Sequence, residues 1–338
     1  MPELYREFSL RNFNTFNLSA MAQLAVVVHS EDDLRRVLAM SEVARLPCLV
    51  IGGGSNLVFT RDFDGLIILM RIQGRRFVGM QEDAWIIEVG AGEVWHNFVE
   101  WTLDIGCPGL ENLALIPGTV GAAPIQNIGA YGIEVAERLH SVRAFDTTTR
   151  TFVTLDAEAC AFGYRDSLFK KNASRYILTQ VTFRLPYPWQ SVIRYAELAR
   201  TLPEQTIKKL SARDIFNSVI GIRRDKLPDP VTMGNAGSFF KNPVLDASTF
   251  IALRERFPNV IAYEQPSGDW KLSAGWMIDQ CGWRGKTLRK AGVYERQALI
   301  LVNLGGASGV DVLTLANAIQ TSVMERFGVK LEIEPLVL

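Results

Sequence analysis

The sequence predicts an α+β protein on the basis of three observations. Apolar runs of four or five residues are typical of short buried strands, and capped amphipathic segments are typical of helices. Two glycine-rich stretches interrupt these elements without a regular pattern of their own. Because 338 residues are too many for one ordinary hydrophobic core, we expect two or three domains.

The composition argues against several classes of protein. Hydrophobic residues make up 48% of the chain and charged residues 21%, as in soluble globular proteins. Lys+Arg and Asp+Glu both total 36, so the charge favours neither a nucleic-acid partner nor a membrane surface. No apolar run reaches the length of a membrane span, and the charged first residues lack the apolar region of a signal peptide. We therefore expect a cytoplasmic protein with no obligate protein partner.

The cysteines and histidines predict neither a disulfide nor a metal site. The four cysteines lie far apart without a C-x-x-C pair, which is typical of reduced thiols in a cytosolic protein. The three histidines are scattered as well, so no zinc site is predicted. These residues are Cys48, Cys107, Cys160, Cys281, His29, His96 and His140.

Helix and strand patterns can be followed along the chain. Ser30, Ser211 and Ser308 each stand three residues before an aspartate, which predicts three helix starts. We expect those helices to bury Leu34 and Val37, then Ile215, Val219 and Ile222, then Val312, Leu315, Ala316, Ile319 and Val323, and a further helix to carry Trp95, Phe98, Val99 and Leu103 on one face. Strands are expected at 48–51, 66–69 and 85–89, in several short runs within 141–185, and at 329–338.

The first glycine-rich loop directly follows a predicted buried strand. Glycines let backbone N–H groups approach a phosphate closely, so this loop is a candidate phosphate cradle. It is not a Rossmann fingerprint, because Leu57 occupies the last glycine position, and no Gly-Lys-Ser/Thr of a P-loop is present. A plain tight turn is the alternative interpretation. The loop consists of Gly52, Gly53, Gly54, Ser55 and Asn56.

The second glycine-rich loop, residues 116–132, combines small residues with amides, a hydroxyl and one aromatic ring, and it has no cation. Such a loop can bind a diphosphate and the edge of a flat ring through neutral donors. An Ω-loop packed on itself is the alternative. Two such loops favour a dinucleotide bound outside the Rossmann class. The candidate cofactor-binding residues here are Pro117, Gly118, Thr119, Gly121, Ala122, Gln126, Asn127, Gly129, Ala130, Tyr131 and Gly132.

Five long motifs, in order along the chain, resemble the UDP-N-acetylenolpyruvoylglucosamine reductase family. They lie at 108–118, 126–132, 162–167, 226–230 and 234–243, and the likeness runs from about Asn14 to the C-terminal residues. The resemblance implies a two-lobed FAD-binding module of the vanillyl-alcohol-oxidase type with a C-terminal α/β substrate-binding domain. The implied domains are a first lobe at 1–75, to which the strand 329–338 is a candidate addition, a second lobe at 76–210 with the tyrosine-loop insertion of type I members, and a substrate domain at 211–328.

The resemblance also implies a reaction and its catalytic residues. NADPH would reduce non-covalently bound FAD, and the reduced flavin would pass hydride to the vinyl carbon of UDP-N-acetylglucosamine-enolpyruvate, giving UDP-N-acetylmuramate for peptidoglycan precursors. Ser238 would donate the proton, Arg165 would hold the substrate carboxylate, and Glu334 would be the third catalytic group. Without the resemblance, Ser238 is a turn residue and Arg165 is the partner of an acid such as Asp166.

The same motif matching implies a set of substrate-binding residues. Arg223 and Lys226, with Arg284 as a further candidate, would meet the diphosphate of the UDP group, and two tyrosines would offer ring and hydroxyl contacts. A partly buried wall position is the ordinary alternative for any one tyrosine. The full set is Tyr195, Arg223, Lys226, Asn242, Tyr263 and Gln297.

The chain departs from the family pattern in one place. Where the family typically has Leu-Glu-Pro-Glu-Val-Arg, this sequence reads Leu331-Glu332-Ile333-Glu334-Pro335-Leu336, so the carboxylate is kept and the arginine is not. Two rival functions remain open at this point. A flavin oxidase of a sugar or alcohol is disfavoured because 52–56 holds no histidine or cysteine for covalent FAD, and a non-catalytic sugar-nucleotide binder is disfavoured because Arg165, Ser238 and Glu334 are all present.

Overall fold

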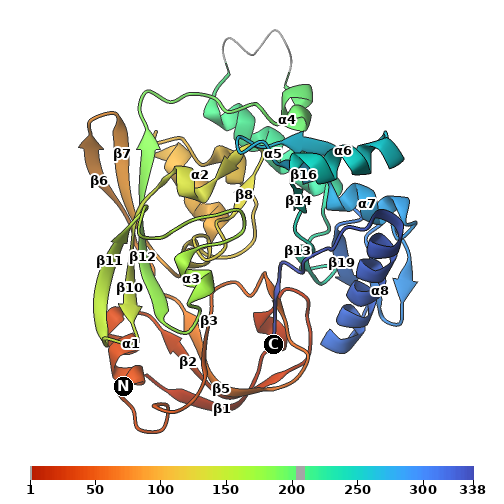
Figure 1. The fold of residues 1–338 in the computed structure, drawn as a ribbon. Helices are drawn as coiled ribbons and strands as arrows, with labels where there is room; N and C mark the ends of the chain where they lie inside the picture. Colours follow the sequence, from red (N-terminus) through yellow and green to blue (C-terminus); the bar gives the residue numbers. More distant parts are fainter. Residues whose placement is uncertain (1, 203–209) are drawn as a thin grey trace. The chain divides into compact units, whose positions relative to one another are not determined.

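The computed structural model describes residues 2–202 and 210–338. The chain divides into two compact units, each made of separated stretches of sequence. The first unit comprises Met1–Phe8, Ala22–Gly53 and Phe63–Asp225, and the second comprises Ser9–Met21, Gly54–Asp62 and Lys226–Leu338. Helices and strands occur in both, as an α+β class requires (Figure 1). The three-part division implied by the family stays a prediction.

The first unit contains a four-stranded sheet of order β1-β2-β5-β3. β5 lies between β2 and β3 and is parallel to both. α1 makes the crossover, and the side chain of its N-cap, Ser30, accepts a hydrogen bond from the N–H of Asp33. Leu34 and Val37 of α1 are buried together with Val26 and Ile68 of the sheet. The elements are β1 (Leu4–Ser9), β2 (Met21–Val28), α1 (Glu31–Leu38), β3 (Cys48–Ile51) and β5 (Phe63–Met70).

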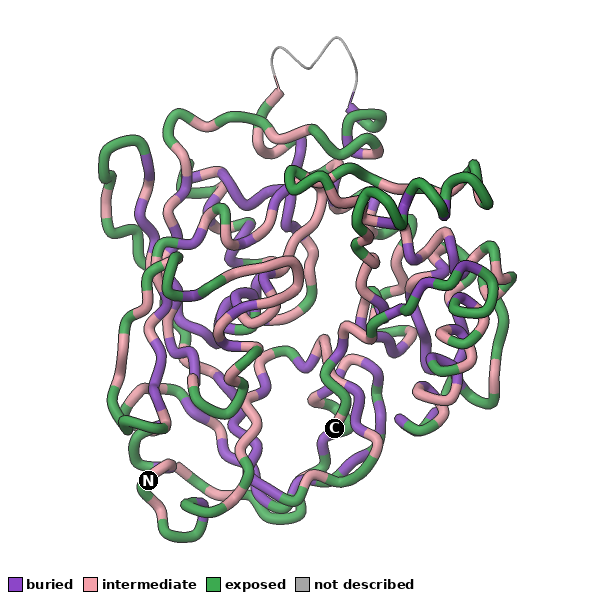
Figure 2. Tube along the Cα trace, viewed as in Figure 1, coloured by how far each residue is buried: buried purple, intermediate pink, exposed green. Residues whose placement is uncertain are grey.

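The other large sheet of the first unit has the order β11-β10-β12-β7-β6 and is antiparallel throughout. Its edge strand β6 is mostly exposed while its neighbour β7 is mostly buried, as the green and purple of Figure 2 show. Trp95, Phe98 and Val99 of α2 belong to one hydrophobic cluster with buried residues of this sheet, whereas Leu103 is only partly buried. The elements are β6 (Arg75–Gln81), β7 (Ala84–Gly90), α2 (Trp95–Asp104), β10 (Leu139–Asp146), β11 (Thr151–Asp156) and β12 (Tyr176–Pro186).

The long stretch after α2 has little regular structure, as its composition predicts. Residues 111–113 and 120–122 form single 3₁₀ turns, and a two-residue hairpin follows. Among the described residues, helices α3, α4 and α5 follow, and α5 ends at Lys226, the first residue of the second unit in this part of the chain and directly before Leu227-Pro228. These elements are β8 (Gly129–Ala130), β9 (Ile133–Glu134), α3 (Leu168–Lys171), α4 (Ala196–Thr201) and α5 (Ala212–Lys226).

The second unit is built on the sheet β13-β19-β18-β17 and the smaller sheet β14-β16-β15. α8 begins at a capping box made by Ser308 and Asp311 and ends at Gly328, which has φ 71°. Its elements are β4 (Leu57–Val58), β13 (Asn235–Ser238), β14 (Val244–Leu245), α6 (Ala247–Arg256), β15 (Ala262–Glu264), β16 (Trp270–Leu272), α7 (Ala274–Gln280), β17 (Thr287–Leu288), β18 (Ala291–Val293), β19 (Ile300–Asn303), α8 (Gly309–Phe327) and β20 (Leu336–Val337).

The predicted C-terminal strand is shorter than its sequence suggests. Only β20 within 329–338 forms a ladder, and it runs parallel to β4. Ile333 makes an isolated bridge to Phe240. Pro335 lies between these two pairings, and because proline has no N–H it interrupts a continuous ladder. The prediction of one strand over the whole of 329–338 was therefore wrong.

Candidate active site

The two glycine-rich loops meet within the first unit. A Cβ atom on Gly52 would lie 2.1 Å from Oγ1 of Thr119, and one on Gly53 would lie 2.8 Å from Cα of Gly118. Gly118 also has φ 120°, a conformation that residues with a Cβ rarely adopt. The close approach therefore requires glycine at these positions, and the two loops present one shared backbone surface.

Backbone hydrogen bonds hold the second loop against the turn between β7 and α2. The N–H of Val120 donates to the carbonyl of Glu93, and the N–H of Gly121 donates to the carbonyl of Ala91. A Cβ on Gly121 would lie 2.5 Å from the Cβ of Ala91. Gly121 is thus required for packing, and its amide is already engaged.

Other amides of the shared surface are available to a ligand. Among the described residues, the N–H groups of Gly53 and Gly118 have no acceptor. Gly53 is exposed and Gly118 is half-buried, so a ligand can reach both, and neutral backbone donors on two close loops fit the phosphate oxygens of a dinucleotide. The arrangement therefore fits a diphosphate-containing cofactor.

Arg71 adds a positive charge beside the first loop, and the sequence analysis did not single it out. Its Nη1 donates to the carbonyls of Met70 at 2.8 Å and Gly52 at 3.1 Å. Burial lowers the pKa of this guanidinium, which nevertheless stays charged at neutral pH. A signal for it exists in the sequence. Arg71 lies two residues after the predicted strand 66–69, and parallel strands bring their carboxyl ends to the same sheet edge.

The remaining residues of the first loop belong to the second unit. Gly54 has φ 65°, and a Cβ there would lie 2.0 Å from the carbonyl oxygen of Phe13. The carbonyl of Asn56 accepts a hydrogen bond of 2.9 Å from the N–H of Leu336. The chain after Glu334 is thereby tied to this loop, in the segment where the family pattern is broken.

Tyr131 and Arg223 are hydrogen-bonded side chains of the first unit. Burial raises the pKa of the Tyr131 phenol to about 12, while the Arg223 contact opposes that rise. The Nε of Arg223 donates to the carbonyl of Leu115 at 3.2 Å. A cation from α5 is thereby placed against the second loop, which itself has none.

Arg165 also lies against the second loop. Its two Nη atoms donate to the carbonyls of Asn127 at 3.2 Å and Gly129 at 2.8 Å. The sequence analysis left open an ion pair between Arg165 and Asp166. In the structure the carboxylate of Asp166 forms an ion pair with Lys171 at 3.0 Å. The guanidinium plane is therefore fixed by backbone carbonyls.

Asn127 organises the loop from inside. Its Nδ2 donates to Glu134 at 2.7 Å and to the carbonyl of Gly163 at 3.0 Å, while its Oδ1 accepts from the N–H of Ala136 at 3.0 Å. The residue is buried and has φ 46°. Its side chain is therefore committed to holding the loop in shape.

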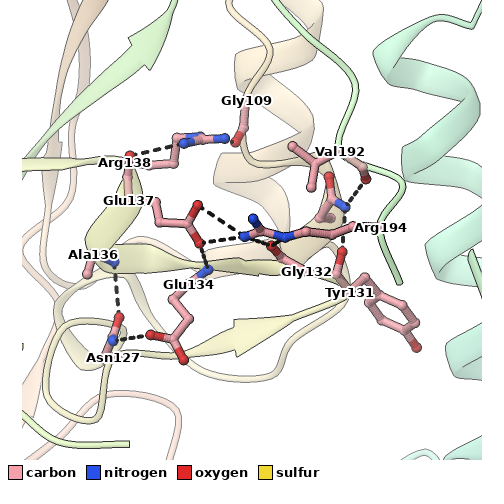
Figure 3. Close-up of polar contacts among 11 residues, drawn as sticks. Gly109, Asn127, Tyr131, Gly132, Glu134, Ala136, Glu137, Arg138, Val192 and Arg194 are labelled. Atoms are coloured by element: carbon pink, nitrogen blue, oxygen red, sulfur yellow. Dashed lines mark hydrogen bonds and ion pairs between the residues drawn. The ribbon is translucent and has the colours of Figure 1, made fainter. Parts of the chain in front are cut away.

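Residues 189–195, here called the tyrosine segment, lie along the same loop (Figure 3). The ring of Tyr195 meets the ring of Tyr131 edge-on, with centroids 5.3 Å apart. Tyr195 itself is 42% exposed, so part of the residue faces solvent. Arg165, Tyr195 and Arg223 thus all contact the second loop or Leu115, the residue directly before it.

Ser238 and Glu334 lie close together in the second unit. Ser238 is exposed at the end of β13, after Gly237 with φ 68°, and a bulge separates its pairing with Ile300 from that of Asn235 with Val302. The N–H of Glu334 donates to the carbonyl of Phe239 at 2.9 Å. Glu334 is therefore opposite the residue that follows Ser238.

The other predicted substrate-binding residues of the second unit have separate surroundings. Oδ1 of Asn242 accepts from the N–H of Ala274 at 3.0 Å. Oε1 of Gln297 accepts from the N–H of Leu299, the residue directly before Ile300, which is the strand partner of Ser238. Tyr263 is exposed on the smaller sheet, Arg284 pairs with Asp279 at 2.9 Å, and Lys226 is exposed at the end of α5.

Two further observations concern metals and membranes. Within residues 2–202 and 210–338, no group of three or more His, Cys, Asp or Glu side chains is arranged to hold a metal ion. None of the helices in this described part of the chain is long and apolar enough to cross a bilayer.

Family models match most of the chain. Residues 22–155 match a model described as FAD binding domain. Residues 229–338 match one described as UDP-N-acetylenolpyruvoylglucosamine reductase, C-terminal domain. The first match contains residues 52–56 and 116–132, and the second contains Ser238 and Glu334.

Full-length proteins are similar as well. The UDP-N-acetylenolpyruvoylglucosamine reductase of Burkholderia mallei (strain NCTC 10229) is 56% identical over 338 residues, covering 99% of this chain and 97% of the relative. That of Paraburkholderia phytofirmans is 54% identical over 334 residues, covering 98% and 96%. The crystal structure of the reductase from Thermus caldophilus superposes with a TM-score of 0.67 at 25% identity, covering 100% of this chain and 98% of the other.

Proposed function

Because this chain belongs to the UDP-N-acetylenolpyruvoylglucosamine reductase family, we propose that it uses NADPH and FAD to reduce UDP-N-acetylglucosamine-enolpyruvate to UDP-N-acetylmuramate. The family is one of oxidoreductases, and residues 22–155 are an FAD-binding domain. The observation that carries the proposal is the meeting of the two glycine-rich loops inside that domain. The product is a precursor of peptidoglycan, which assigns the protein to cell-wall synthesis.

The backbone of the two loops would hold FAD without a covalent bond. Gly53 and Gly118 offer N–H donors to the diphosphate, and Arg71 places a charge beside them. Gly121 and Asn127 shape the second loop, and the other small residues of 116–132 keep the backbone accessible. When bound, FAD takes hydride from NADPH and passes it to the terminal vinyl carbon of the substrate.

Arg165 would hold the substrate carboxylate. Hydride addition makes the vinyl carbon a methyl group and leaves negative charge on the neighbouring carbon and its carboxylate. A guanidinium can share that charge through two parallel hydrogen bonds. The contacts to Asn127 and Gly129 fix its orientation in advance, so little ordering is left for the moment of reaction.

Ser238 would supply the proton that this carbon needs. A serine hydroxyl is a weak acid, so the step depends on neighbours that stabilise its conjugate base or relay a proton to it. The ε-ammonium of Lys241, three residues along the chain, is held by Glu332 at 3.0 Å. Glu334, fixed beside Phe239, would hydrogen-bond the carboxylate of the substrate or the neighbourhood of the reacting carbon.

Cations, tyrosines and amides are the candidate groups for binding the substrate's nucleotide part. Arg223, Lys226 and Arg284 offer cations to its diphosphate, and Tyr195 and Tyr263 offer exposed ring faces. Asn242 and Gln297 add amides near the Ser238 strand. We further propose a cytoplasmic location, which the free thiol state of all four cysteines supports.

A spectroscopic titration tests the proposed function. Under anaerobic conditions, NADPH is expected to bleach the flavin absorbance of the purified protein, and UDP-N-acetylglucosamine-enolpyruvate is expected to restore it. UDP-N-acetylglucosamine, which lacks the enolpyruvyl group, is the control and should restore nothing. Flavin that returns to the oxidised form only with oxygen would identify an oxidase and overturn the proposal. Identity of 56% to reductases already weighs against that alternative.

A further inference from the structure

Asn112 joins the second loop to the tyrosine segment. Its Nδ2 lies 2.8 Å from the carbonyl oxygen of Tyr131 and 2.8 Å from that of Val192. Two carbonyl acceptors identify this atom as the amide nitrogen, since an oxygen there would face two other oxygens. One side chain therefore spans two backbone segments.

The surroundings of Asn112 show that this bridge is its main contact. The residue is fully buried, and its Oδ1 is the single buried side-chain oxygen or nitrogen of the described residues that lacks a partner. Leaving a buried carbonyl unpaired is unfavourable. Among side chains of this size, only asparagine can donate twice from one atom, so the two donated bonds explain the residue.

Arg194 makes a second connection between the same segments (Figure 3). Its Nε donates to the carbonyl of Gly132 at 2.8 Å, and its Nη2 reaches the same oxygen and lies 3.4 Å from Glu137. A Cβ on Gly132 would lie 3.0 Å from Cγ of Arg194. The arginine thus covers the residue next to Tyr131.

A third contact fixes the start of the segment. The Nε1 of Trp189 donates to Glu111 at 2.7 Å, and the other carboxylate oxygen of Glu111 accepts from the N–H of Gly109 at 2.7 Å. The contacts of Trp189, Val192 and Arg194 come in sequence order and lead to Tyr195, whose ring rests on Tyr131.

We propose that Asn112 and Arg194 are positioning residues for Tyr195, which they hold against Tyr131 by tying the tyrosine segment to the second glycine-rich loop. Neither touches the reacting atoms. The consequence is that the geometry of a proposed cofactor-binding loop and that of a proposed substrate-binding tyrosine depend on each other. The inference rests on the role proposed for Tyr195 only where substrate binding is concerned.

The holding contacts are tested without any substrate. Chymotrypsin cleaves after Tyr195 only when the segment leaves the loop, because a protease must bind an extended chain. We expect Arg194→Ala and Asn112→Leu to be cleaved at this bond at least about fivefold faster than the parent, since one lost hydrogen bond changes an opening equilibrium by about that factor. Arg194→Lys should be cleaved at a rate between that of the parent and that of Arg194→Ala. Arg184→Ala removes a partly exposed, ion-paired arginine of β12 and is the matched control.

The kinetic arm uses the holoenzyme and separates positioning from general damage. Arg194→Ala should raise KM for the enolpyruvyl substrate about fivefold, leave the rate of flavin reduction by NADPH unchanged, and add little to the effect of Tyr195→Phe in the double variant. Cleavage at Tyr195 that stays at the parent rate in both single variants overturns the proposal, as does a slowed NADPH step with an unchanged KM. If no variant or parent turns over the substrate, the proposed function fails while the cleavage arm still decides whether the segment is held.

Discussion

Lys241 and Glu332 form an ion pair, with the ammonium nitrogen 3.0 Å from a carboxylate oxygen. The strand contact that brings them together also places Glu334 opposite Phe239. Two carboxylates only two residues apart therefore have different neighbours. Glu332 is committed to a lysine, whereas Glu334 lies beside the Ser238 turn.

This difference predicts that Glu334→Gln loses far more activity than Glu332→Gln. If Glu334 contacts the substrate near the reacting carbon, its variant should reoxidise the reduced flavin with substrate about a hundredfold more slowly, as for other single positioned catalytic groups. Glu332→Gln should lose little, because the Glu332 side chain is 66% exposed and an ion pair of an exposed carboxylate contributes little. Stopped-flow absorbance measures both, after FAD content has been checked. Equal losses of activity, or a larger loss in Glu332→Gln, would show that the catalytic role does not belong to Glu334.

Ser238→Ala is expected to separate the two halves of the reaction. NADPH should bleach the flavin at the parent rate, because that half needs no proton from this hydroxyl. Reoxidation by the enolpyruvyl substrate should slow by a factor of about a hundred to ten thousand, the usual contribution of a positioned acid. Rapid-mixing traces report each half separately. Normal reoxidation would remove Ser238 from the mechanism, and Ser248→Ala, an exposed serine of α6, serves as the control.

Local signals predicted helices α1, α2, α5 and α8, whereas the capped helices α6 and α7 were not predicted. Ser30, Ser211 and Ser308 each accept or donate hydrogen bonds at a helix start as their spacing indicates, since a cap depends on neighbours within four residues. The run 329–338 failed for the opposite reason. A strand exists only where a partner strand meets it, and the partners here, β4 and Phe240, are distant in sequence.

The candidate site shows the same limit. The glycines at 52, 53 and 118 pointed to close backbone contacts, but that they approach one another is a long-range fact. Arg71 and Asn112 were not singled out because each acts through carbonyls far along the chain. Residue type alone does not disclose a backbone acceptor, whereas a motif with side-chain chemistry, such as that around Ser238, is visible in the sequence.

The flavin should leave the protein intact on denaturation. Neither histidine nor cysteine occurs in 52–56, and the glycines there offer FAD non-covalent contacts with the backbone. We expect a yellow protein that releases one FAD per chain after heating or acid treatment, measured by absorbance of the supernatant and by mass spectrometry. Flavin that stays with the precipitated chain would contradict non-covalent binding, and a colourless protein would contradict the cofactor.

Tyr195→Phe should weaken substrate binding without affecting reduction by NADPH. The phenylalanine keeps the edge-on ring contact with Tyr131 and removes only the hydroxyl. Loss of one hydrogen bond to the substrate corresponds to an increase of about fivefold to tenfold in KM. Steady-state kinetics give KM, and anaerobic mixing gives the NADPH step. An unchanged KM with a slowed NADPH step would place Tyr195 in the other half of the reaction.

The last prediction concerns acid stability and Asp146, a buried carboxylate at the end of β10. Hydrogen bonds from Arg175, the shortest 2.8 Å, and from the N–H of Thr148 hold the pKa of Asp146 below its usual range. The unfolded chain, with a pKa of about 3.9, therefore binds a proton before the folded chain does as the pH falls. The stabilisation by Asp146 is fully present above that pH and is lost as the pH falls through the lower, folded pKa.

The amide of Asp146→Asn carries no charge and does not titrate. Its loss of stability relative to the parent should therefore be largest at pH 6–7 and shrink progressively below about pH 4. Urea unfolding of the holoenzyme at pH 7, 5, 4 and 3 measures the difference in the free energy of unfolding. Arg175→Met should show the same narrowing, because it removes the other half of the interaction. Asp64→Asn, at an exposed position of β5, is the control for general effects of charge removal. A deficit that stays constant from pH 7 to pH 3 would mean that Asp146 stabilises the fold through packing and not through its charged hydrogen bonds.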